Sequence, residues 1–536
     1  MQLPVRRLVS ATRSNPRWRW TATFLLVAIV GTVWAFSDPL FAPADEASHT
    51  IRAAAVSRGQ LTGDPLTPEQ AADLTWGIGG RQGPPPSAYL AVDVPGIYDT
   101  PAYNCFVFQP AVTPDCVHFS GSTATKSIVT AVPRYPPAYY AWVGILSRPF
   151  EPGSVQMYAM RIASVLLMAA LLASAFETVF TFARSRVAAL GLLVAVTPQV
   201  LFINAAVNPS AMEIAAGIAL WTSGVTLARA TPEQISNRLI ARTGSAAILL
   251  VLARHASPLW LGLILVALVL FTNRETLKAL VRRRAAWLWG IGVAIAAVST
   301  VAWIAVEDPL STQHSIFPAG GYTNQQVLRF AFGGIWGHYR AMIGLFGWSD
   351  TPVPSLTIFL WTGLVGILAV VALAFCRGRR PLLVFAGICA GSALVPVAVD
   401  SYSAISNDVG MTWQGRYGLP FAVGVPIVAG LLASTTESQV FFKRRVLVVL
   451  WATVVVAQTA AFWQMLRKYT SGADGALRFW VHPKWTPPIP VVTVAIAFPL
   501  AMAAFGWWCL STARWTEESG FSEAASQLPR LAHSAP

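Results

Sequence analysis

Residues 21–37 read TATFLLVAIVGTVWAFS, a run without a charged side chain that follows an arginine-rich N-terminal segment. A helix needs about 20 mostly apolar residues to cross the hydrocarbon core of a bilayer. The run therefore predicts a membrane-spanning helix. It lacks a small-x-small cleavage site near its end, and more apolar runs follow. We therefore expect an uncleaved first helix, with residues 1–20 in the cytoplasm.

Apolar runs of similar length recur along the 536 residues. Hydrophobic residues make up 55% of the chain and charged residues 12%, about half of the charged share of a soluble domain. This composition excludes an ordinary soluble enzyme, a coiled coil and a disordered chain, and it predicts an all-α integral membrane protein. The further candidate spans are residues 155–179, 187–206, 210–227, 285–306, 355–376, 381–399, 417–434, 446–464 and 489–510.

The chain contains 38 Lys and Arg against 24 Asp and Glu, a net charge of +14. In a soluble chain this excess would suggest nucleic acid. Here the basic residues form short runs between apolar segments, as orientation signals do, so a nucleic-acid partner is not expected. The runs that we expect on the cytoplasmic side are Arg184 and Arg186; Arg229, Arg238 and Arg242; Arg274, Lys278 and residues 282–284; Arg377, Arg379 and Arg380; and residues 443–445.

One region conflicts with simple alternation of sides. Residues 242–274 form a single apolar region, yet both flanks carry cytoplasmic signals. Two shorter helices that turn near residues 254–258 would resolve the conflict, and Pro258 suits such a break. The chain would then cross about twelve times, with both termini in the cytoplasm. The multi-helix membrane domain would occupy residues 137–510, with residues 137–150 as a surface or half-inserted helix.

This topology predicts a long first external loop, residues 38–136, while residues 511–536 form a cytoplasmic tail that is expected to be disordered. Cys105 and Cys116 lie together in the external loop. Because disulfides form in oxidising compartments, we expect these two cysteines to be bonded.

The first candidate for chemistry follows the first helix. Residues from Glu46 onward predict a helix that Gly59 ends, with Asp45, His49 and Arg52 at i, i+4 and i+7 on one face. A carboxylate, an imidazole and a guanidinium in this arrangement could act as base, orienting group and phosphate clamp. The alternative is that Asp45 only caps the helix.

Two further candidates are basic residues with aromatic or apolar neighbours. Arg254 and His255 lie inside an apolar region, where an arginine costs roughly 2.5–3.5 kcal/mol on insertion scales. They could hold an anionic head group, or Arg254 could extend to the membrane surface. Arg416 and Tyr417 could bind a phosphate or a sugar ring, or could be interfacial anchors. Arg134 adds a cation at the end of the first external loop.

Several chemistries find no support in the sequence. It contains no phosphate-binding Walker loop, no zinc-protease motif, no nucleophile elbow and no His or Cys spacing suited to zinc. We therefore assign no metal ligands. Asp350 in the second external loop, residues 307–354, is a weaker acid candidate than Asp45. The basic loop at residues 465–488 suggests attraction to lipid phosphates.

Four motifs together resemble a bacterial domain-of-unknown-function family of multi-pass membrane proteins related to GT-C glycosyltransferases. They are residues 43–53 (PADEASHTIRA), residues 135–140 (YPPAYY), residues 346–348 (FGW) and residues 415–417 (GRY) followed by Pro420. They occur in this order and span most of the chain.

The resemblance implies a GT-C-like membrane enzyme in a bacterial plasma membrane. Such an enzyme takes a sugar from a polyprenyl-phosphate carrier on the external face and transfers it to a cell-envelope glycan, lipid or protein. By this resemblance Asp45 is the general base and Glu46 a supporting acid. Whether a divalent cation takes part stays open. Ser210 follows Asn208-Pro209 where the family often has an acid, so this sequence departs from the family pattern there.

A transporter or flippase of a lipid-linked sugar is the alternative function. It would equally explain Arg254 and the basic loop at residues 465–488. The sequence shows no repeat symmetry, and the first external loop is longer than transport requires. Both observations favour the glycosyltransferase. A structural envelope scaffold is the third option, and the charge inside the membrane region disfavours it.

Overall fold

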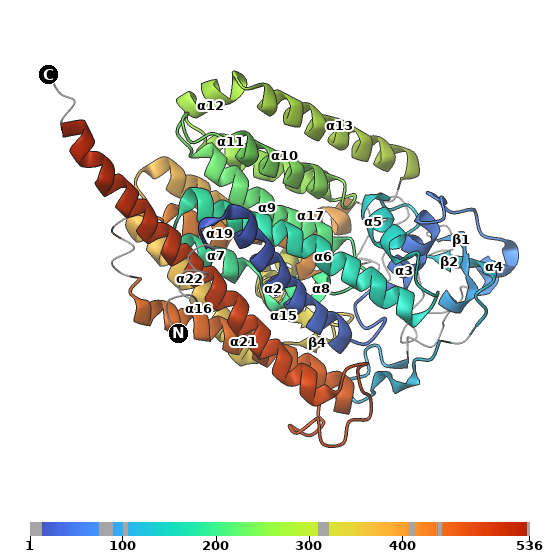
Figure 1. The fold of residues 1–536 in the computed structure, drawn as a ribbon. Helices are drawn as coiled ribbons and strands as arrows, with labels where there is room; N and C mark the ends of the chain where they lie inside the picture. The colour runs from blue at the N-terminus through green and yellow to red at the C-terminus, as the bar shows by residue number, and fades with distance from the viewer. Residues whose placement is uncertain are drawn as a thin grey trace.

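The computed structural model describes residues 13–73, 89–99, 105–119, 121–308, 321–406, 413–435, 437 and 442–532. The described chain is a bundle of long helices with a smaller unit at one end, which we call the loop end (Figure 1). The bundle contains α2 (Pro16–Ser37), α6 (Ser154–Thr178), α7 (Arg186–Ala195), α8 (Pro198–Asn204), α9 (Ser210–Ala228), α10 (Asn237–Val251), α11 (Ser257–Phe271), α13 (Arg284–Glu307), α16 (Ser355–Phe375), α17 (Arg379–Ser406), α18 (Gly415–Ala422), α19 (Gly424–Leu432), α21 (Arg444–Ser471) and α22 (Val491–Ala532).

Nine helices in the described ranges are long and apolar enough to cross a membrane. Two bent pairs, α7 with α8 and α11 with α12 (Arg274–Val281), bring this number to eleven, and α10 is a shorter helix of 15 residues. Each of the twelve predicted crossings coincides with one helix or with two successive helices. The predicted all-α integral membrane fold with about twelve helices is therefore confirmed.

The last helix, α22, extends to Ala532 and so runs through most of residues 511–536, for which the sequence predicts a disordered tail. Residues 533–536 of that predicted tail lie outside the described residues.

The apolar region 242–274 contains a break between two helices. α10 ends at Val251 and α11 begins at Ser257, where the sequence predicts a turn. Each helix has 15 residues and is therefore about 22 Å long, shorter than the roughly 30 Å hydrocarbon core. The backbone N–H of Arg254 donates to the hydroxyl of Ser257 at 3.0 Å, so a side chain satisfies a backbone group that the break leaves free.

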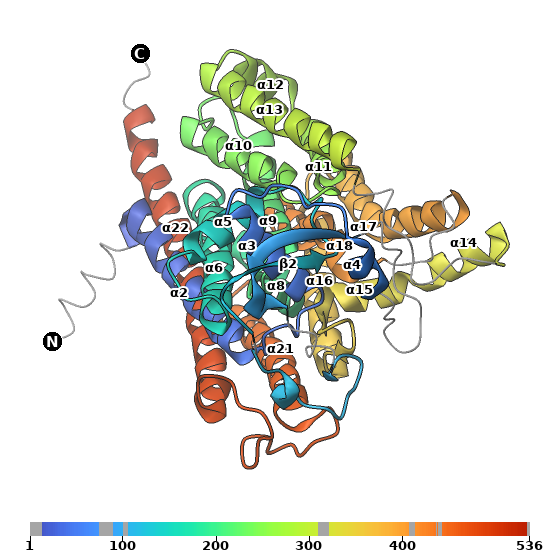
Figure 2. The ribbon, with the colours of Figure 1, turned by 90° about the vertical axis from the view of Figure 1, so that its right-hand side faces the viewer.

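The smaller unit at the loop end comes mainly from the first loop. It contains α3 (Glu46–Val56), α4 (Pro68–Asp73), α5 (Ala138–Ser147) and an antiparallel pair of strands, β1 (Leu90–Pro95) and β2 (Thr125–Thr130), in which Leu90 pairs with Thr130. Figure 2 faces this end and shows α3 beside β2, two elements that are in contact. A Cβ at Gly144 of α5 would lie 2.3 Å from the carbonyl oxygen of Ala53, so only glycine permits this close approach to α3.

The second loop adds α14 (Asn324–Gly333), α15 (Ile335–Gly344) and a short strand pair, β3 (Leu345–Phe346) with β4 (Thr351–Pro352).

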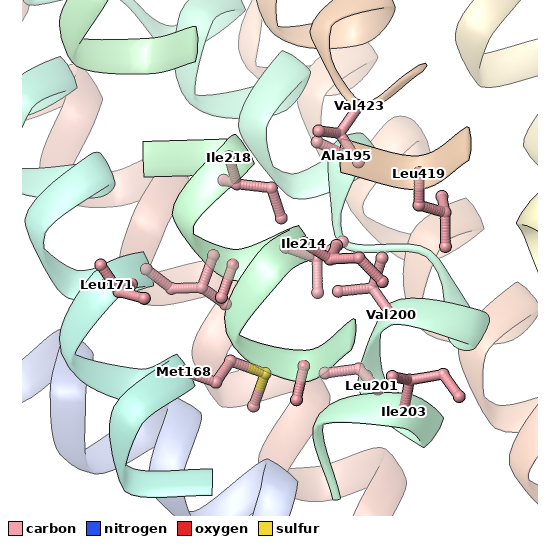
Figure 3. Packing of buried hydrophobic residues seen from close by; sticks show 14 of the residues in the cluster. Met168, Leu171, Ala195, Val200, Leu201, Ile203, Ile214, Ile218, Leu419 and Val423 are labelled. Carbon is pink, nitrogen blue, oxygen red and sulfur yellow. The ribbon is translucent and has the colours of Figure 1, made fainter. Parts of the chain in front are cut away.

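The core of the bundle surrounds α9, whose 18-residue apolar window is 94% buried. Figure 3 shows Ile214 and Ile218 of α9 among side chains of α6, α8 and α18, including Met168 and Leu419. Near the middle of α9, a Cβ at Gly217 would lie 2.7 Å from the carbonyl oxygen of Pro420. The absence of a side chain there lets α18 pack directly against α9.

A buried ion pair fastens the first loop to α6. Arg161 donates through Nε and Nη2 to the Glu46 carboxylate at 2.7 and 2.5 Å. Its remaining donors reach the backbone carbonyls of Ala35, Asp38 and Pro39 at 2.6–2.9 Å. All five N–H groups of the guanidinium are thus used, and neither side chain is exposed.

Removal of one partner of this pair should be costly because the other charge would stay buried without compensation. For Glu46→Ala we expect a loss of about 3–5 kcal/mol in the free energy of unfolding, measured as denaturant or thermal unfolding of the purified protein. The control is Glu151→Ala, a change of an exposed glutamate, which should stay within about 0.5 kcal/mol of wild type. Equal stability of the two variants would contradict a structural role of the pair.

The break between α10 and α11 predicts that residue 283 lies on the cytoplasmic side. The variant Arg283→Cys should therefore resist labelling by a membrane-impermeant thiol reagent in intact cells and should react after permeabilisation. Thr123→Cys in the exposed first loop is the control and should react in intact cells. Labelling of position 283 from outside would show that residues 242–274 cross the membrane an odd number of times.

Candidate functional site

Asp45 stands directly before α3 in an unusual backbone conformation. Its φ is 66°, in the left-handed region, and its side chain makes no capping hydrogen bond. Instead the Asp45 carboxylate accepts from Nη2 of Arg416 at 2.8 Å. The Asp45 side chain is 41% exposed, whereas that of Arg416 is 5% exposed. The geometry therefore gives no support to a capping role and leaves the carboxylate accessible to a ligand.

Arg254, at the break between α10 and α11, is buried and paired rather than extended to the surface. Its Nη1 donates to the Ser210 hydroxyl at 3.0 Å and lies 3.5 Å from the carboxylate of Glu213. The Ser257 hydroxyl donates to the same carboxylate at 2.7 Å. The start of α9 and the break thus hold the guanidinium in one position.

Tyr417 connects the two arginines. The guanidinium carbon of Arg254 lies 4.7 Å from the centroid of its ring, and that of Arg416 lies 5.2 Å from the same centroid. Both distances are within the range of cation–π attraction. Asp45, Arg416, Tyr417 and Arg254 therefore form one connected group at the loop end, which we call the Asp45 cluster.

His49 and Arg52 of α3 contact tyrosines that lie next to this cluster. The Nδ1 atom of His49 lies 2.9 Å from the Tyr140 hydroxyl, and Nη2 of Arg52 donates to the backbone carbonyl of Tyr135 at 3.0 Å. The ring of Tyr135 lies 6.0 Å from the Arg254 guanidinium. His49 and Arg52 therefore contact Tyr140 and Tyr135, and the Tyr135 ring in turn lies beside Arg254.

The two remaining predicted binding residues lie at the edge of this arrangement. The ring of His255 meets the Tyr135 ring edge-on, with centroids 4.9 Å apart. The carbonyl oxygen of Arg134 accepts from Nε1 of Trp303 at 2.9 Å, which ties the end of the first loop to α13.

The two other acids named from the sequence are engaged in holding loops. Glu46 accepts from Arg161 and also from the backbone N–H groups of Phe41 and Val207, both at 2.9 Å. Asp350 accepts from the backbone N–H of Phe108 at 3.1 Å, which joins the second loop to the first. Glu46 thus holds the backbone before α3, and Asp350 links the first and second loops.

The first loop also contains the disulfide between Cys105 and Cys116. Close to it, Nζ of Lys468 at the end of α21 donates to the carbonyl of Gln109 at 2.7 Å. One lysine of this basic region is thus used to hold the first loop. In the described part of the chain, no group of three or more His, Cys, Asp or Glu side chains could hold a metal ion.

Sequence reasoning missed Arg161 and Glu213. Both are charged residues inside apolar spans, and both are fully buried in ion pairs. A charged residue inside an apolar span is also the feature that makes Arg254 a candidate, and this feature could have identified Arg161 and Glu213. Their partners could not be named from the sequence, because Arg161 and Glu46 are 115 residues apart.

The environment of His49 makes stability depend on pH. Burial, together with the guanidinium groups of Arg416 and Arg254, holds the pKa of His49 well below its ordinary value. His49 therefore stays neutral in the folded protein, whereas the unfolded chain binds a proton below about pH 6.5. Stability should consequently fall as the pH drops below that value, by up to about 1.4 kcal/mol per pH unit from this group.

Thermal unfolding between pH 5 and 8 tests this expectation. His49→Gln should show a shallower loss of stability at acidic pH than wild type, while substitution of the exposed His482 by Gln should leave the wild-type slope. If His49→Gln retains the full slope, His49 does not resist protonation in the folded state.

Among solved structures, the chain is similar to ArnT from Cupriavidus metallidurans in a crystal structure with bound undecaprenyl phosphate. The two share 13% sequence identity with a TM-score of 0.42, over 96% of this chain and 81% of that one. No curated protein matches the chain significantly. Residues 26–425, about three-quarters of the chain, match the family described as "Predicted membrane protein (DUF2142)". As the four motifs predict, the chain belongs to this family of membrane proteins.

Proposed function

We propose that the protein is a membrane glycosyltransferase that moves a sugar from a polyprenyl-phosphate carrier to a cell-envelope acceptor at the external face. The observation that carries this proposal is the Asp45 cluster. It combines a partly exposed carboxylate, which can accept a proton, with two buried guanidinium groups, which can bind a phosphate. The resemblance of the four motifs to a family related to GT-C glycosyltransferases supports the same reaction class.

The reaction is a single displacement at the anomeric carbon. The acceptor oxygen forms a bond to that carbon, and its proton passes to the Asp45 carboxylate. The bond between the anomeric carbon and the phosphate oxygen breaks, and its electron pair leaves with the lipid phosphate. Arg254 and Arg416 stabilise the negative charge that develops on this phosphate, an effect that is strong where water is partly excluded.

The guanidinium groups are prepared for this role by the groups around them. Glu213 holds Arg254, and Asp45 holds Arg416, so neither side chain has to be ordered when substrate arrives. Arg416 Nε is buried without a hydrogen-bond partner among the described residues. Since a buried unsatisfied donor is costly, a phosphate oxygen that reaches this atom would gain binding energy.

An apolar cavity on the same helix as Arg416 suits the lipid part of the donor. The cavity has a volume of about 440 Å³, which is in the range of ligand sites. α18 carries Arg416 near its start and contributes Leu419 and Ala422 to the cavity wall. A phosphate at Arg416 and an isoprenoid chain along α18 would therefore be continuous.

Transport of a lipid-linked sugar is the second candidate, because a buried arginine beside an apolar cavity could also serve a moving lipid. The two functions differ in their product. Purified protein in nanodiscs, incubated with labelled polyprenyl-phosphate sugars and cell-envelope extract, should move label from the lipid to the acceptor fraction. A flippase would instead change the leaflet of the labelled lipid in proteoliposomes and leave the sugar on its carrier.

The variant Asp45→Asn tests whether Asp45 is the general base. Asn tolerates the left-handed backbone and has a similar shape, but it has no carboxylate that could accept a proton. We expect transfer activity to fall roughly 10²–10⁴-fold while the thermal midpoint stays close to that of wild type.

Asp350→Asn is the matched control, since it makes the same chemical change at another loop-end acid. It should retain most of the transfer activity. Activity of Asp45→Asn within a few-fold of wild type, with loss in Asp350→Asn, would transfer the role of base to Asp350.

A further inference from the structure

A second charged pocket lies at the end of the bundle opposite the Asp45 cluster. It has a volume of about 310 Å³, and three arginines from three distant parts of the chain line it. Arg13 precedes α2, Arg444 begins α21, and Arg514 lies on α22. The Asp45 cluster follows the other end of α2, which has 22 residues and is therefore about 33 Å long. The two sites thus lie near opposite surfaces of a membrane.

We propose that this pocket binds the phosphate headgroup of an anionic phospholipid. Its described lining residues include three guanidinium groups and no carboxylate, so the pocket is complementary to an anion. Guanidinium groups match the oxygen geometry of a phosphate and can bind two of its oxygens at once. Basic pockets between membrane helices on the cytoplasmic side are typical sites for such headgroups.

Arg13 shows that the pocket is partly prepared for its ligand. Its Nη2 donates to the Ser511 hydroxyl at 2.9 Å, and its guanidinium carbon lies 5.8 Å from the centroid of the Trp508 ring. The Nε atom is buried and has no hydrogen-bond partner among the described groups. Contacts within the fold therefore hold the side chain in place, while a donor stays available to an anion.

The remaining lining favours a lipid over a soluble anion. Apolar and aromatic side chains of α21 and α22 form the rest of the wall: Leu447, Val448, Trp451, Trp507 and Leu510. Trp507 is 48% exposed and Val448 is 37% exposed, so an acyl chain could cover them. A ligand that satisfies both the arginines and this apolar wall has a phosphate attached to a hydrocarbon chain. Tryptophan is also typical of the level of the headgroups.

The bound lipid would join the start of the chain to its last helices. Nε1 of Trp508 donates to the Thr23 hydroxyl at 3.0 Å, so α22 contacts α2 without a lipid. A phospholipid between Arg13, Arg444 and Arg514 would add a link among α2, α21 and α22. Since Asp45 follows α2, this lipid would stabilise the helix that leads to the proposed catalytic loop without contacting the sugar donor.

The test uses the full-length protein in detergent, with phosphatidylglycerol or phosphatidylcholine added at matched concentration. Phosphatidylglycerol should raise the thermal midpoint, and phosphatidylcholine should not. Arg444→Gln should weaken the apparent affinity for phosphatidylglycerol by about tenfold, as expected for loss of a charge-assisted contact. Arg444 is exposed, so this variant should fold.

Arg445→Gln is the matched control. It removes the same charge from the neighbouring exposed position, outside the lining of the pocket, and should respond to phosphatidylglycerol like wild type. Equal responses of the two variants, or equal stabilisation by the two lipids, would overturn the proposed site. A third sample contains inorganic phosphate alone, and full stabilisation there would identify the ligand as a soluble anion instead of a lipid.

Discussion

The ion pair between Arg161 and Glu46 is the contact on which the geometry of the loop end depends. A guanidinium inside an apolar helix is unfavourable unless its charge and all its donors are satisfied. Here one carboxylate and three backbone carbonyls meet that demand, and all of them come from residues 35–46. The chain that leaves α2 is therefore held in a fixed path around Arg161. Asp45, next to Glu46, is positioned as a consequence.

The Asp45 cluster solves a second electrostatic problem. Two guanidinium groups beside one phenol ring repel each other, and two carboxylates of different exposure offset this repulsion: Asp45 within the cluster and Glu213 next to it. Glu213 is fully buried, whereas Asp45 is partly open. The buried acid keeps Arg254 in place. In the proposed function, the open acid and its arginine exchange partners when a phosphate binds. This difference in exposure separates a structural carboxylate from one that could take part in chemistry.

Much of the architecture could be predicted from the sequence because a bilayer requires long apolar helices and because charged residues disfavour its interior. The helix spans and the break near Arg254 follow from these two constraints. The backbone of Asp45 could not be predicted, since its left-handed conformation depends on contacts with residues that are distant in the chain. Asp45 and Arg416 are 371 positions apart, and only the folded bundle brings them together. The buried partners of Glu46 and Arg254 escaped prediction for the same reason.

The separation of Glu46 and Arg161 also bears on how the protein is made. At about 5–20 residues per second, the ribosome needs roughly 6–23 s to synthesise the 115 residues between them. During this interval Glu46 is already part of a nascent loop, yet its partner has not been inserted. The first loop must therefore reach its side of the membrane before α6 can be seated stably. Burial of Arg161 is thus coupled to placement of the preceding loop, and α6 without that loop would hold a buried arginine without its carboxylate partner.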